Sequence, residues 1–307
     1  MRVAALFSGC GGLDLGFEKA GYEIVWANDY DKYAVQTYNL NMKTHAICAD
    51  INSLDLNEIP QHDVLIGGFP CQPFSMMGQE KGFNDTRGTL FFRVMEIVDN
   101  QKTRGFPPKV IVLENVRNLL THDNGKTFFR IKGELNERGY KVYAKLLNSA
   151  DYGVPQTRNR VFIVCFHDQE IEYEFPSVIP LEKTLQDILE QEVDEKYFLS
   201  EKIKKTILSD GSGNYFAKSE TDLSIARPLT ATMAKMHRAC QDNYVTQNGR
   251  LRRLTPRECA RLQGFSDTFK FNVSDAQAYK QFGNAVTVDV AYAIAKSIRE
   301  KVDFNND

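Results

Sequence analysis

A single cysteine, Cys71, lies between two prolines in the segment GGFPCQPFS, residues 67–75. Pro70 and Pro73 each fix a backbone dihedral angle and restrict the residue before them, so the chain around the thiol is stiff. A thiolate that is held in a fixed geometry can act as a nucleophile. The alternative is an inert packing residue, as single cysteines usually are. The prolines and the position just after an apolar segment favour the nucleophile.

A carboxyl group and two guanidinium groups are candidates for the same crevice. Glu114 and Asn115 end an apolar segment, so the carboxyl group can lie near Cys71. Arg158 and Arg160 occupy alternate positions before another apolar segment and therefore lie on one face of it. Two guanidinium groups suit an anion or a polarised carbonyl. The alternatives are a carboxylate that makes a turn and edge arginines in solvent.

A glycine-rich segment, FSGCGGLDLG, follows the first apolar segment and has glycines at 9, 11, 12 and 16. It lacks the Gly-Lys-Ser/Thr ending of a phosphate loop and the G-x-G-x-x-G spacing of dinucleotide sites. Asp29 and Asp50 end later strands, where acidic residues accept hydrogen bonds from ribose hydroxyls. We expect a nucleoside cofactor without a pyrophosphate, and S-adenosylmethionine fits. The alternative is a tight structural turn with solvated carboxylates.

Apolar segments alternate with amphipathic ones over the first 166 residues. This pattern predicts a doubly wound α/β sheet, a Rossmann-like fold whose active residues lie at the carboxyl ends of the strands. The predicted strands are 2–8, 22–29, 63–69, 109–116, 140–148 and 160–166, and the predicted helices are 11–21, 31–41, 89–102 and 127–139.

The alternation stops near His167, which predicts a second, smaller domain. We expect a catalytic and cofactor-binding domain of residues 1–175 plus 276–307 and a small domain of residues 176–275, to which the resemblance described below assigns target recognition. A proline follows Thr255, and Glu258 stands three positions after it. This spacing predicts a capping box at the start of a helix. Residues 287–302 predict a final helix that packs back on the first domain.

Composition indicates an ordinary globular protein. The chain has 307 residues, 42% hydrophobic and 25% charged, and no apolar run of the length that a membrane span needs. The six cysteines are scattered, so we expect no disulfide framework, no metal site and a cytoplasmic location. Residues 168–201 hold eleven acidic residues against two lysines, and residues 227–261 hold eight basic residues against two acidic ones. The basic segment can face phosphates, or both segments are solvated surfaces.

Six segments, in order, resemble the cytosine-5 DNA methyltransferases, particularly the small bacterial enzymes of restriction-modification systems. The resemblance covers nearly the whole chain, through FSGCGGLDLGF, GGFPCQPFS, ENV, QTRNR, RRLTPRECARLQGF and QFGNAV. It implies a nucleophile at Cys71, an acidic partner at Glu114, and support of a flipped base by Arg158 and Arg160. It implies cofactor contacts from Phe7, Ser8, Gly9, Gly11, Gly12, Asp29, Tyr30, Asp50, Ile51, Pro70 and Asn284, and DNA contacts from Gln72, Ser75 and Thr230.

The chemistry explains these residue types. Carbon 5 of cytosine is too weak a nucleophile to attack a methyl sulfonium, so the resemblance implies addition of the Cys71 thiolate to carbon 6. Glu114 would neutralise charge at ring nitrogen 3. The cytosine must be flipped out of the duplex, at a cost of a few kcal/mol.

Sequence specificity is predicted to reside in the small domain, where base edges would be read by side chains such as Arg238. Arg252, just before the capped helix, is predicted to contact the DNA backbone or to serve domain packing. The recognition region is short and begins with the acidic segment, and Ala285 stands where the family commonly has serine.

Duplex DNA is the expected partner, with a cognate restriction endonuclease acting on the same site, and we expect a monomer. One alternative is an RNA cytosine-5 methyltransferase of the same fold, but the Cys-Phe-Thr element of those enzymes is absent. Another is a catalytically silent DNA-binding regulator. Intact Cys71 and Glu114 argue against a silent protein.

Overall fold

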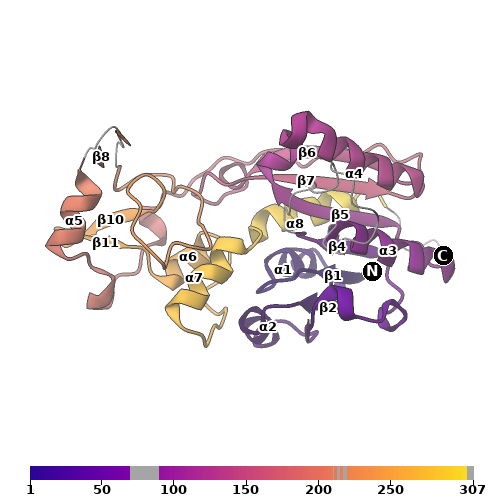
Figure 1. Ribbon diagram of the computed structural model, residues 1–307, viewed down its shortest axis with the longest axis horizontal. Helices are drawn as coiled ribbons and strands as arrows, with labels where there is room; N and C mark the ends of the chain where they lie inside the picture. The colour runs from indigo at the N-terminus through magenta and orange to yellow at the C-terminus, as the bar shows by residue number, and fades with distance from the viewer. Residues whose placement is uncertain (70–89, 210, 213–214, 217–219, 303–307) are drawn as a thin grey trace, which may run out of the picture. The chain divides into compact units, whose positions relative to one another are not determined.

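Two compact units make up the chain (Figure 1). The computed structural model describes residues 1–69, 90–209, 211–212, 215–216 and 220–302. The first unit comprises Met1–Leu147, Asn159–Ser177 and Ala291–Asp307, and the second comprises Asn148–Arg158 and Val178–Val290. These limits place 148–158 and 276–290 with the second unit, whereas the sequence prediction placed them with the catalytic domain. The assignment of the domains to catalysis and target recognition stays a prediction.

A seven-stranded sheet forms the centre of the first unit, in the order β3-β2-β1-β4-β5-β7-β6. The strands β1, β2, β3, β4 and β5 are parallel to one another, and β7 runs antiparallel to β5. The predicted α/β sheet is therefore confirmed. The strands are β1 (Arg2–Leu6), β2 (Glu23–Asp29), β3 (Ile47–Cys48), β4 (Val64–Gly67), β5 (Val110–Val116), β6 (Lys141–Asn148) and β7 (Asn159–Phe166).

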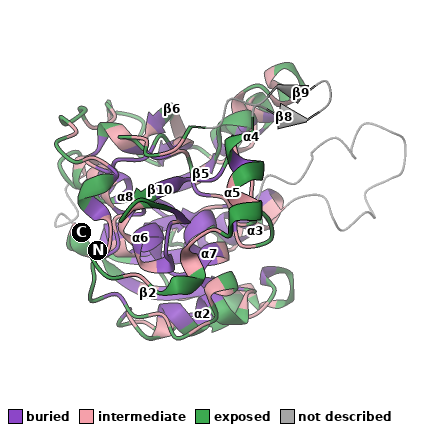
Figure 2. Ribbon diagram, turned by 90° about the vertical axis from the view of Figure 1, so that its left-hand side faces the viewer, coloured by how far each residue is buried: buried purple, intermediate pink, exposed green. Residues whose placement is uncertain are grey.

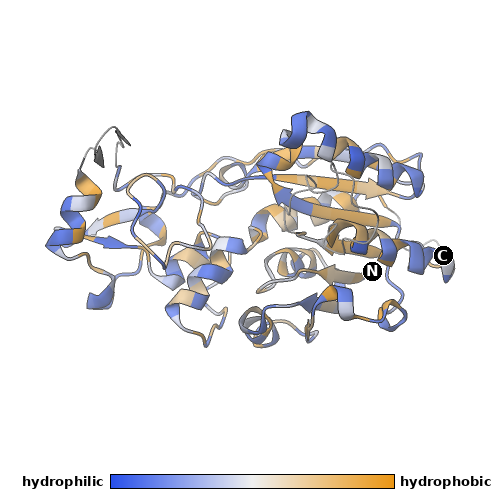
Figure 3. Ribbon diagram, viewed as in Figure 1, coloured by the Kyte–Doolittle hydropathy of each residue, from blue (hydrophilic) through white to orange (hydrophobic). Residues whose placement is uncertain are grey.

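Helices cover both faces of this sheet, which is why β1, β4 and β5 read as continuous apolar runs (Figures 2 and 3). On one face, Ala4, Leu65 and Ile111 belong to a core cluster that includes residues of α3 and α4. The helices of the first unit are α1 (Gly12–Lys19), α2 (Lys32–Asn39), α3 (Leu90–Thr103), α4 (Lys126–Glu137) and most of α8 (Val288–Arg299).

The helix α8 packs against α1, as predicted for the last helix. A Cβ atom on Gly16 would lie 2.4 Å from the Cβ atom of Ala291, so only glycine permits this approach. The Tyr22 hydroxyl also donates to the Ala295 carbonyl at 3.1 Å. Gly16 therefore serves helix packing, although the sequence pattern grouped it with the ligand-binding glycines.

The second unit contains a β-hairpin that the sequence analysis did not predict. Its strands are β10 (Tyr244–Gln247) and β11 (Arg250–Arg253). The connecting residues, Asn248 and Gly249, have φ angles of 52° and 73°. An Asn-Gly pair is the usual signal for such a turn, because both residues tolerate positive φ. This signal was present in the sequence.

The other elements of the second unit are helices, short turns and a small strand pair. They are α5 (Glu201–Leu208), α6 (Pro256–Arg261), α7 (Asp275–Asn284), β8 (Gly211–Ser212) and β9 (Tyr215–Phe216). Short 3-10 turns across the chain are η1 (Ile51–Ser53), η2 (Leu56–Glu58), η4 (Arg117–Leu120), η5 (His122–Gly125), η6 (Ser149–Asp151), η7 (Gln186–Ile188) and η8 (Glu195–Tyr197). The predicted capping box at Thr255 is confirmed.

Arg252 is buried and paired inside the second unit. Its side chain is 0% exposed, and its guanidinium donates to both carboxylate oxygens of Glu258 at 2.7 and 2.8 Å. The Nε atom donates to Gln247 at 2.6 Å. The predicted contact of Arg252 with DNA is therefore wrong, because the guanidinium is enclosed by protein. The buried ion pair agrees with the alternative prediction, in which Arg252 serves the packing of its own domain.

Arg252→Ala should lower the free energy of unfolding by about 3 to 5 kcal/mol, because it leaves the Glu258 carboxylate buried without its partner. Urea unfolding measures this loss. Arg250→Ala is the matched control, since the exposed Arg250–Glu195 pair contributes about 0 to 1 kcal/mol. Unchanged stability with weaker binding to all DNA sequences would contradict the buried role.

Candidate functional site

The carboxyl ends of β1, β2, β4 and β5 lie at the same edge of the sheet, because these strands are parallel. This edge brings together the glycine-rich loop of residues 7–12, Asp29, Phe69 and Glu114. The predicted residues Pro70, Cys71, Gln72 and Ser75 follow Phe69 and lie outside the described residues. The edge of the sheet is therefore the candidate site of the first unit.

Asp29 fixes the shape of the glycine-rich loop. Its Oδ2 atom accepts a hydrogen bond from the Gly9 amide at 2.8 Å, and its Oδ1 atom accepts one from the Asp31 amide at 2.8 Å. The carboxylate thus joins the end of β2 to the turn after β1. This positioning role was not predicted from the sequence, and the predicted contact with a ribose stays a prediction.

The loop leaves room for a ligand beside Gly9. Gly9 has a φ of +57°, and a Cβ atom there would lie within 4 Å of no atom from the described residues beyond its chain neighbours. Phe7 also has a positive φ, of 53°, a backbone conformation that residues other than glycine rarely adopt. The Tyr30 side chain, at the end of β2, is 72% exposed and offers an aromatic face. An open backbone turn next to a free ring fits a nucleoside.

The remaining predicted cofactor residues fall into two groups. Asp50 is exposed and accepts a hydrogen bond from the Asn52 amide at 2.9 Å, and Asn284 is exposed at the end of α7 in the second unit. Ser8 and Ile51 are buried, and Ile51 belongs to the core cluster. The contacts predicted for all of these residues stay predictions.

A buried carboxyl group, Asp14, lies in the first turn of α1 and was not singled out in the sequence. Its Oδ1 atom accepts a hydrogen bond from the buried Tyr38 hydroxyl at 3.0 Å. The Tyr38 ring packs against Gly11, where a Cβ atom would lie 3.2 Å from the ring. Burial raises the pKa of Asp14 to about 7, and the charge of Asp29 adds to the rise, while the hydrogen bond from Tyr38 opposes it.

The raised pKa of Asp14 predicts a loss of stability with rising pH. The unfolded chain ionises this group near pH 3.8 but the folded chain only near pH 7, so native stability falls between these values. Asp14→Asn keeps an acceptor for Tyr38 and cannot ionise. Its melting temperature relative to the native chain should rise from pH 4 to pH 7 and then stay constant. Parallel melting curves over this range would contradict the prediction.

Glu114 and Arg160 form an ion pair on neighbouring strands. The Nε atom of Arg160 lies 3.0 Å from the Oε1 atom of Glu114. Glu114 is on β5 and Arg160 pairs with Val116 two residues further, so the two side chains are diagonal neighbours across the strands. The sequence predicted both residues at the site, and the structure brings these two together. Arg160 fixes the orientation of the Glu114 carboxyl group.

Asn115, the residue after Glu114, anchors the chain that leads to Cys71. Its side-chain amide is buried and donates to the Phe69 carbonyl at 2.8 Å. Phe69 is the last described residue before Pro70. The sequence placed Asn115 at a strand end but gave no signal for this bond. The bond fixes where the segment with the predicted nucleophile begins.

Arg158 serves the interior of the second unit. Its side chain is 1% exposed, and its guanidinium donates to the carbonyls of Leu229 at 3.0 Å, Gly283 at 3.0 Å and Ala285 at 2.9 Å. The support of a flipped base that was predicted for Arg158 stays a prediction. Arg158 instead joins the segments that carry Thr230 and Asn284.

Arg238 is also engaged within the protein. Its guanidinium donates to the hydroxyls of Thr230 at 2.6 Å and Thr232 at 3.0 Å and to the Asp242 carboxylate at 2.9 Å. Bidentate reading of a base requires a guanidinium that faces the groove. The Arg238 side chain is 21% exposed, and the base reading predicted for it stays a prediction, as does the DNA contact predicted for Thr230.

The basic segment 227–261 is largely neutralised by internal ion pairs. Five of its eight cationic residues lie within 4.0 Å of a carboxylate, namely Arg227, Arg238, Arg250, Arg252 and Arg261. Much of the positive charge of this segment is therefore balanced within the protein, and its predicted contact with phosphates stays a prediction. Within the described part of the chain, Lys235 is exposed and has no ion-pair partner.

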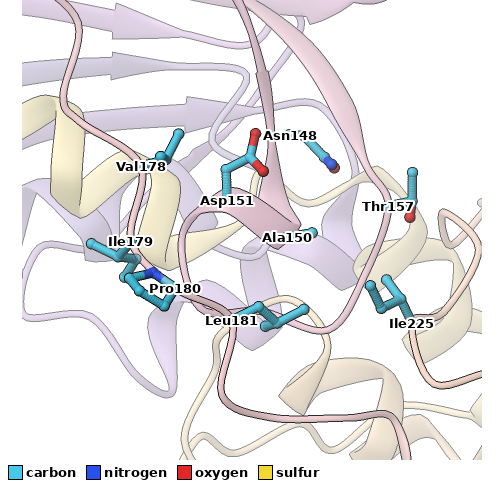
Figure 4. Close-up of a pocket in the computed structure, with 9 residues that line it drawn as sticks. All are labelled: Asn148, Ala150, Asp151, Thr157, Val178, Ile179, Pro180, Leu181 and Ile225. Carbon is cyan, nitrogen blue, oxygen red and sulfur yellow. The ribbon is translucent and has the colours of Figure 1, made fainter.

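A pocket in the second unit lies apart from the predicted residues. It has a volume of about 490 Å³, and its wall is mainly apolar, with Val178, Ile179 and Ile225 beside Asp151 (Figure 4). No predicted site residue lines it. We therefore do not assign the cofactor to this pocket.

Other features of the described ranges concern metals, thiols and membranes. Histidine, cysteine and acidic side chains do not cluster there as a metal-binding group would. The five cysteines of these ranges, at 10, 48, 165, 240 and 259, are not joined in disulfides. Among the same ranges, every helix is too short or too polar to cross a membrane.

Comparison with known proteins identifies a matching family model and several proteins of similar sequence. A family model described as C-5 cytosine-specific DNA methylase matches residues 1–300. Type II methyltransferase M.NlaX of Neisseria lactamica is 40% identical over 314 residues, which cover 100% of this chain and 98% of the relative. Type II methyltransferase M.HhaI of Haemophilus parahaemolyticus is 37% identical, with 99% and 96% covered.

Solved structures share the fold at low sequence identity. The Entamoeba histolytica methyltransferase EhMeth has a TM-score of 0.81 at 21% identity, with 99% of each chain covered. The S. pombe Dnmt2 methyltransferase has a TM-score of 0.80 at 23% identity, with 98% of this chain and 99% of that chain covered. At this level of identity, the likeness shows the fold alone.

Proposed function

Because this chain belongs to the C-5 cytosine-specific DNA methylases, we propose that it methylates carbon 5 of one cytosine within a specific short sequence of duplex DNA. The methyl donor in this proposal is S-adenosylmethionine. One observation supports this proposal most directly. The edge of the sheet where the parallel strands end carries both the glycine-rich loop, which Asp29 holds through Gly9, and the ion pair of Glu114 and Arg160. Type II methyltransferases among the relatives suggest a restriction-modification system, with a cognate endonuclease for the same site.

The glycine-rich loop would hold the cofactor. The open space beside Gly9 admits a ligand close to the backbone, and the exposed ring of Tyr30 can stack on an adenine. Asp29 and Asp50 would accept hydrogen bonds from the ribose hydroxyls, with further contacts from Phe7 and the other predicted residues. When bound, S-adenosylmethionine supplies an electrophilic methyl group on a sulfonium.

Cys71 would supply the nucleophile. Its thiolate adds to carbon 6 of the flipped cytosine, so that the electrons of the 5,6 double bond become available at carbon 5. After methylation, loss of the proton from carbon 5 restores the double bond and expels the thiolate. The Asn115–Phe69 bond holds the start of the segment that carries Cys71 at the strand edge.

Glu114 would hold ring nitrogen 3 of the cytosine by a hydrogen bond and thereby stabilise charge in the ring. General acid–base help of this kind contributes about 10²- to 10⁴-fold to the rate. Arg160 restricts the carboxyl group to one orientation through its 3.0 Å contact. In this proposal Arg160 is a positioning residue, and a monomer carries all of these groups.

Cys71→Ala should abolish methyl transfer and leave S-adenosylmethionine binding intact, because Asp29 and the glycine loop are unchanged. The native chain should form a covalent adduct with duplex DNA that contains 5-fluorocytosine, because fluorine cannot leave as a proton does. Denaturing electrophoresis detects the adduct.

Two controls define this test. Cys48→Ala removes an exposed thiol that lies outside the predicted site residues, and it should still form the adduct. A single-stranded RNA that contains 5-fluorocytosine tests the RNA alternative and should form none. An adduct with Cys71→Ala would exclude Cys71 as the nucleophile.

Asp29→Ala should weaken S-adenosylmethionine binding by about 1.5 to 3 kcal/mol, because it removes a charged acceptor and also the bond that pins Gly9. Titration calorimetry measures the affinity. Asp55→Ala, an exposed carboxylate that caps a 3-10 turn elsewhere, is the control and should bind normally. An unaltered affinity in Asp29→Ala would count against the assigned cofactor loop.

A further inference from the structure

The glycine-rich loop packs against a buried polar pair to which the proposed chemistry gives no role. Asp14, in the first turn of α1, accepts a hydrogen bond from the Tyr38 hydroxyl of α2 at 3.0 Å, and both side chains are buried. The Tyr38 ring contacts Gly11, where an added Cβ atom would lie 3.2 Å from the ring. The pair therefore joins α1 to α2 at the loop that the proposed function assigns to the cofactor.

The Asp14 carboxyl group has one oxygen without a hydrogen bond. Its Oδ2 atom is buried and has no hydrogen-bond partner among the described residues, and the same holds for the Oγ atom of Ser8 in the loop itself. The Asp14 side chain is 1% exposed, so water does not solvate it. Burial of a carboxylate without a full set of donors costs free energy, and this cost favours the protonated form.

The ionisable groups that face Asp14 offer it no positive charge. In the described ranges they are the Cys10 thiol in the loop, the Asp29 carboxylate at the end of β2 and the Tyr38 hydroxyl on α2. Asp29 repels a second negative charge, and Glu18 on α1 adds another near Tyr38. Burial raises the pKa of Cys10 and of Tyr38, so both groups are neutral. Within the part of the chain that the structure describes, the cluster therefore lacks a counter-ion.

The cofactor of the proposed function carries the charge that this cluster lacks. S-adenosylmethionine has a sulfonium and an ammonium against one carboxylate and is therefore a cation, whereas its product S-adenosylhomocysteine has a neutral thioether. A positive charge near a buried carboxyl group favours the ionised form, because protein screens the attraction less than water does. A cation that binds at the loop should therefore convert Asp14 from the acid to the carboxylate.

We propose that Asp14 determines the preference of the loop for a cationic cofactor. Its carboxyl group releases a proton when S-adenosylmethionine binds, and the resulting carboxylate favours this cofactor over the neutral product. The O–H bond of the acid breaks, its electron pair stays on the carboxylate, and the proton passes to the solvent. This inference rests on the proposed function, because that function assigns S-adenosylmethionine to the glycine-rich loop.

The direction of the pH dependence follows from the state of Asp14 before binding. Burial raises the pKa of this group to about 7 in the free protein, so the acid predominates below that pH. A bound cation lowers the pKa, and binding below pH 7 then releases up to about one proton. The affinity for S-adenosylmethionine should rise by up to about tenfold per pH unit as the pH approaches 7, and it should level off above this value.

Titration calorimetry in buffers of different ionisation enthalpy counts the protons that binding releases, and it needs no DNA. The native chain should release more protons with S-adenosylmethionine than with S-adenosylhomocysteine. Asp14→Asn should bind like the native chain at low pH, more weakly above pH 7, and with less proton release. The α-amino group of each ligand also titrates, at about pH 8. This contribution is common to both proteins, so the difference between them belongs to Asp14.

Tyr38→Phe is a second variant with a distinct outcome. It removes a hydrogen bond that favours the Asp14 carboxylate, so the pH at which the affinity levels off should move upward. A purely structural role of the pair would instead lower the affinity equally at every pH. Glu23→Gln removes an exposed carboxylate at the start of β2 and is the matched control. It should change neither the affinity nor the proton release.

Two results would overturn the inference. One is binding of S-adenosylmethionine to the native chain with no proton release near pH 7. The other is the same proton release in Asp14→Asn, because another group would then be its source. Failure of the proposed function is distinguishable, since the native chain would then bind no S-adenosylmethionine or methylate no duplex.

Discussion

The carboxylate of Asp29 joins two turns that the candidate site depends on. By accepting the amides of Gly9 and Asp31, it fixes the loop after β1 relative to the end of β2. The other groups of the site then follow from the sheet, because Phe69 and Glu114 end neighbouring parallel strands. Breaking these bonds would leave a buried carboxylate without its two backbone donors, which costs free energy. The turn is therefore held in one conformation before any ligand binds.

Much of the first unit could be predicted because its strands are buried on both faces and leave continuous apolar runs in the sequence. The strand-end rule then placed Glu114 at the site, and the alternation of side chains placed Arg160 there. The role of Gly16 could not be predicted in the same way. The requirement for glycine comes from Ala291, which lies on a helix far away in the sequence.

The arginines show the limit of prediction most clearly. Sequence marks a guanidinium as charged, but whether it faces DNA or the protein interior depends on acceptors at distant positions. Arg158 finds its three carbonyls at residues 229, 283 and 285. For Arg252, the Asn-Gly turn before it was a usable signal, because a hairpin strand turns alternate side chains inward.

The packing of α8 on α1 has a consequence for biosynthesis. The bond between Tyr22 and Ala295 joins residues 273 positions apart, and the second unit is synthesised between them. While the ribosome translates that unit, the face of α1 around Gly16 lacks its partner helix and exposes apolar surface to water. Contacts of such long sequence separation form late and slowly. During translation, this face is therefore a natural substrate for chaperones that bind exposed apolar segments.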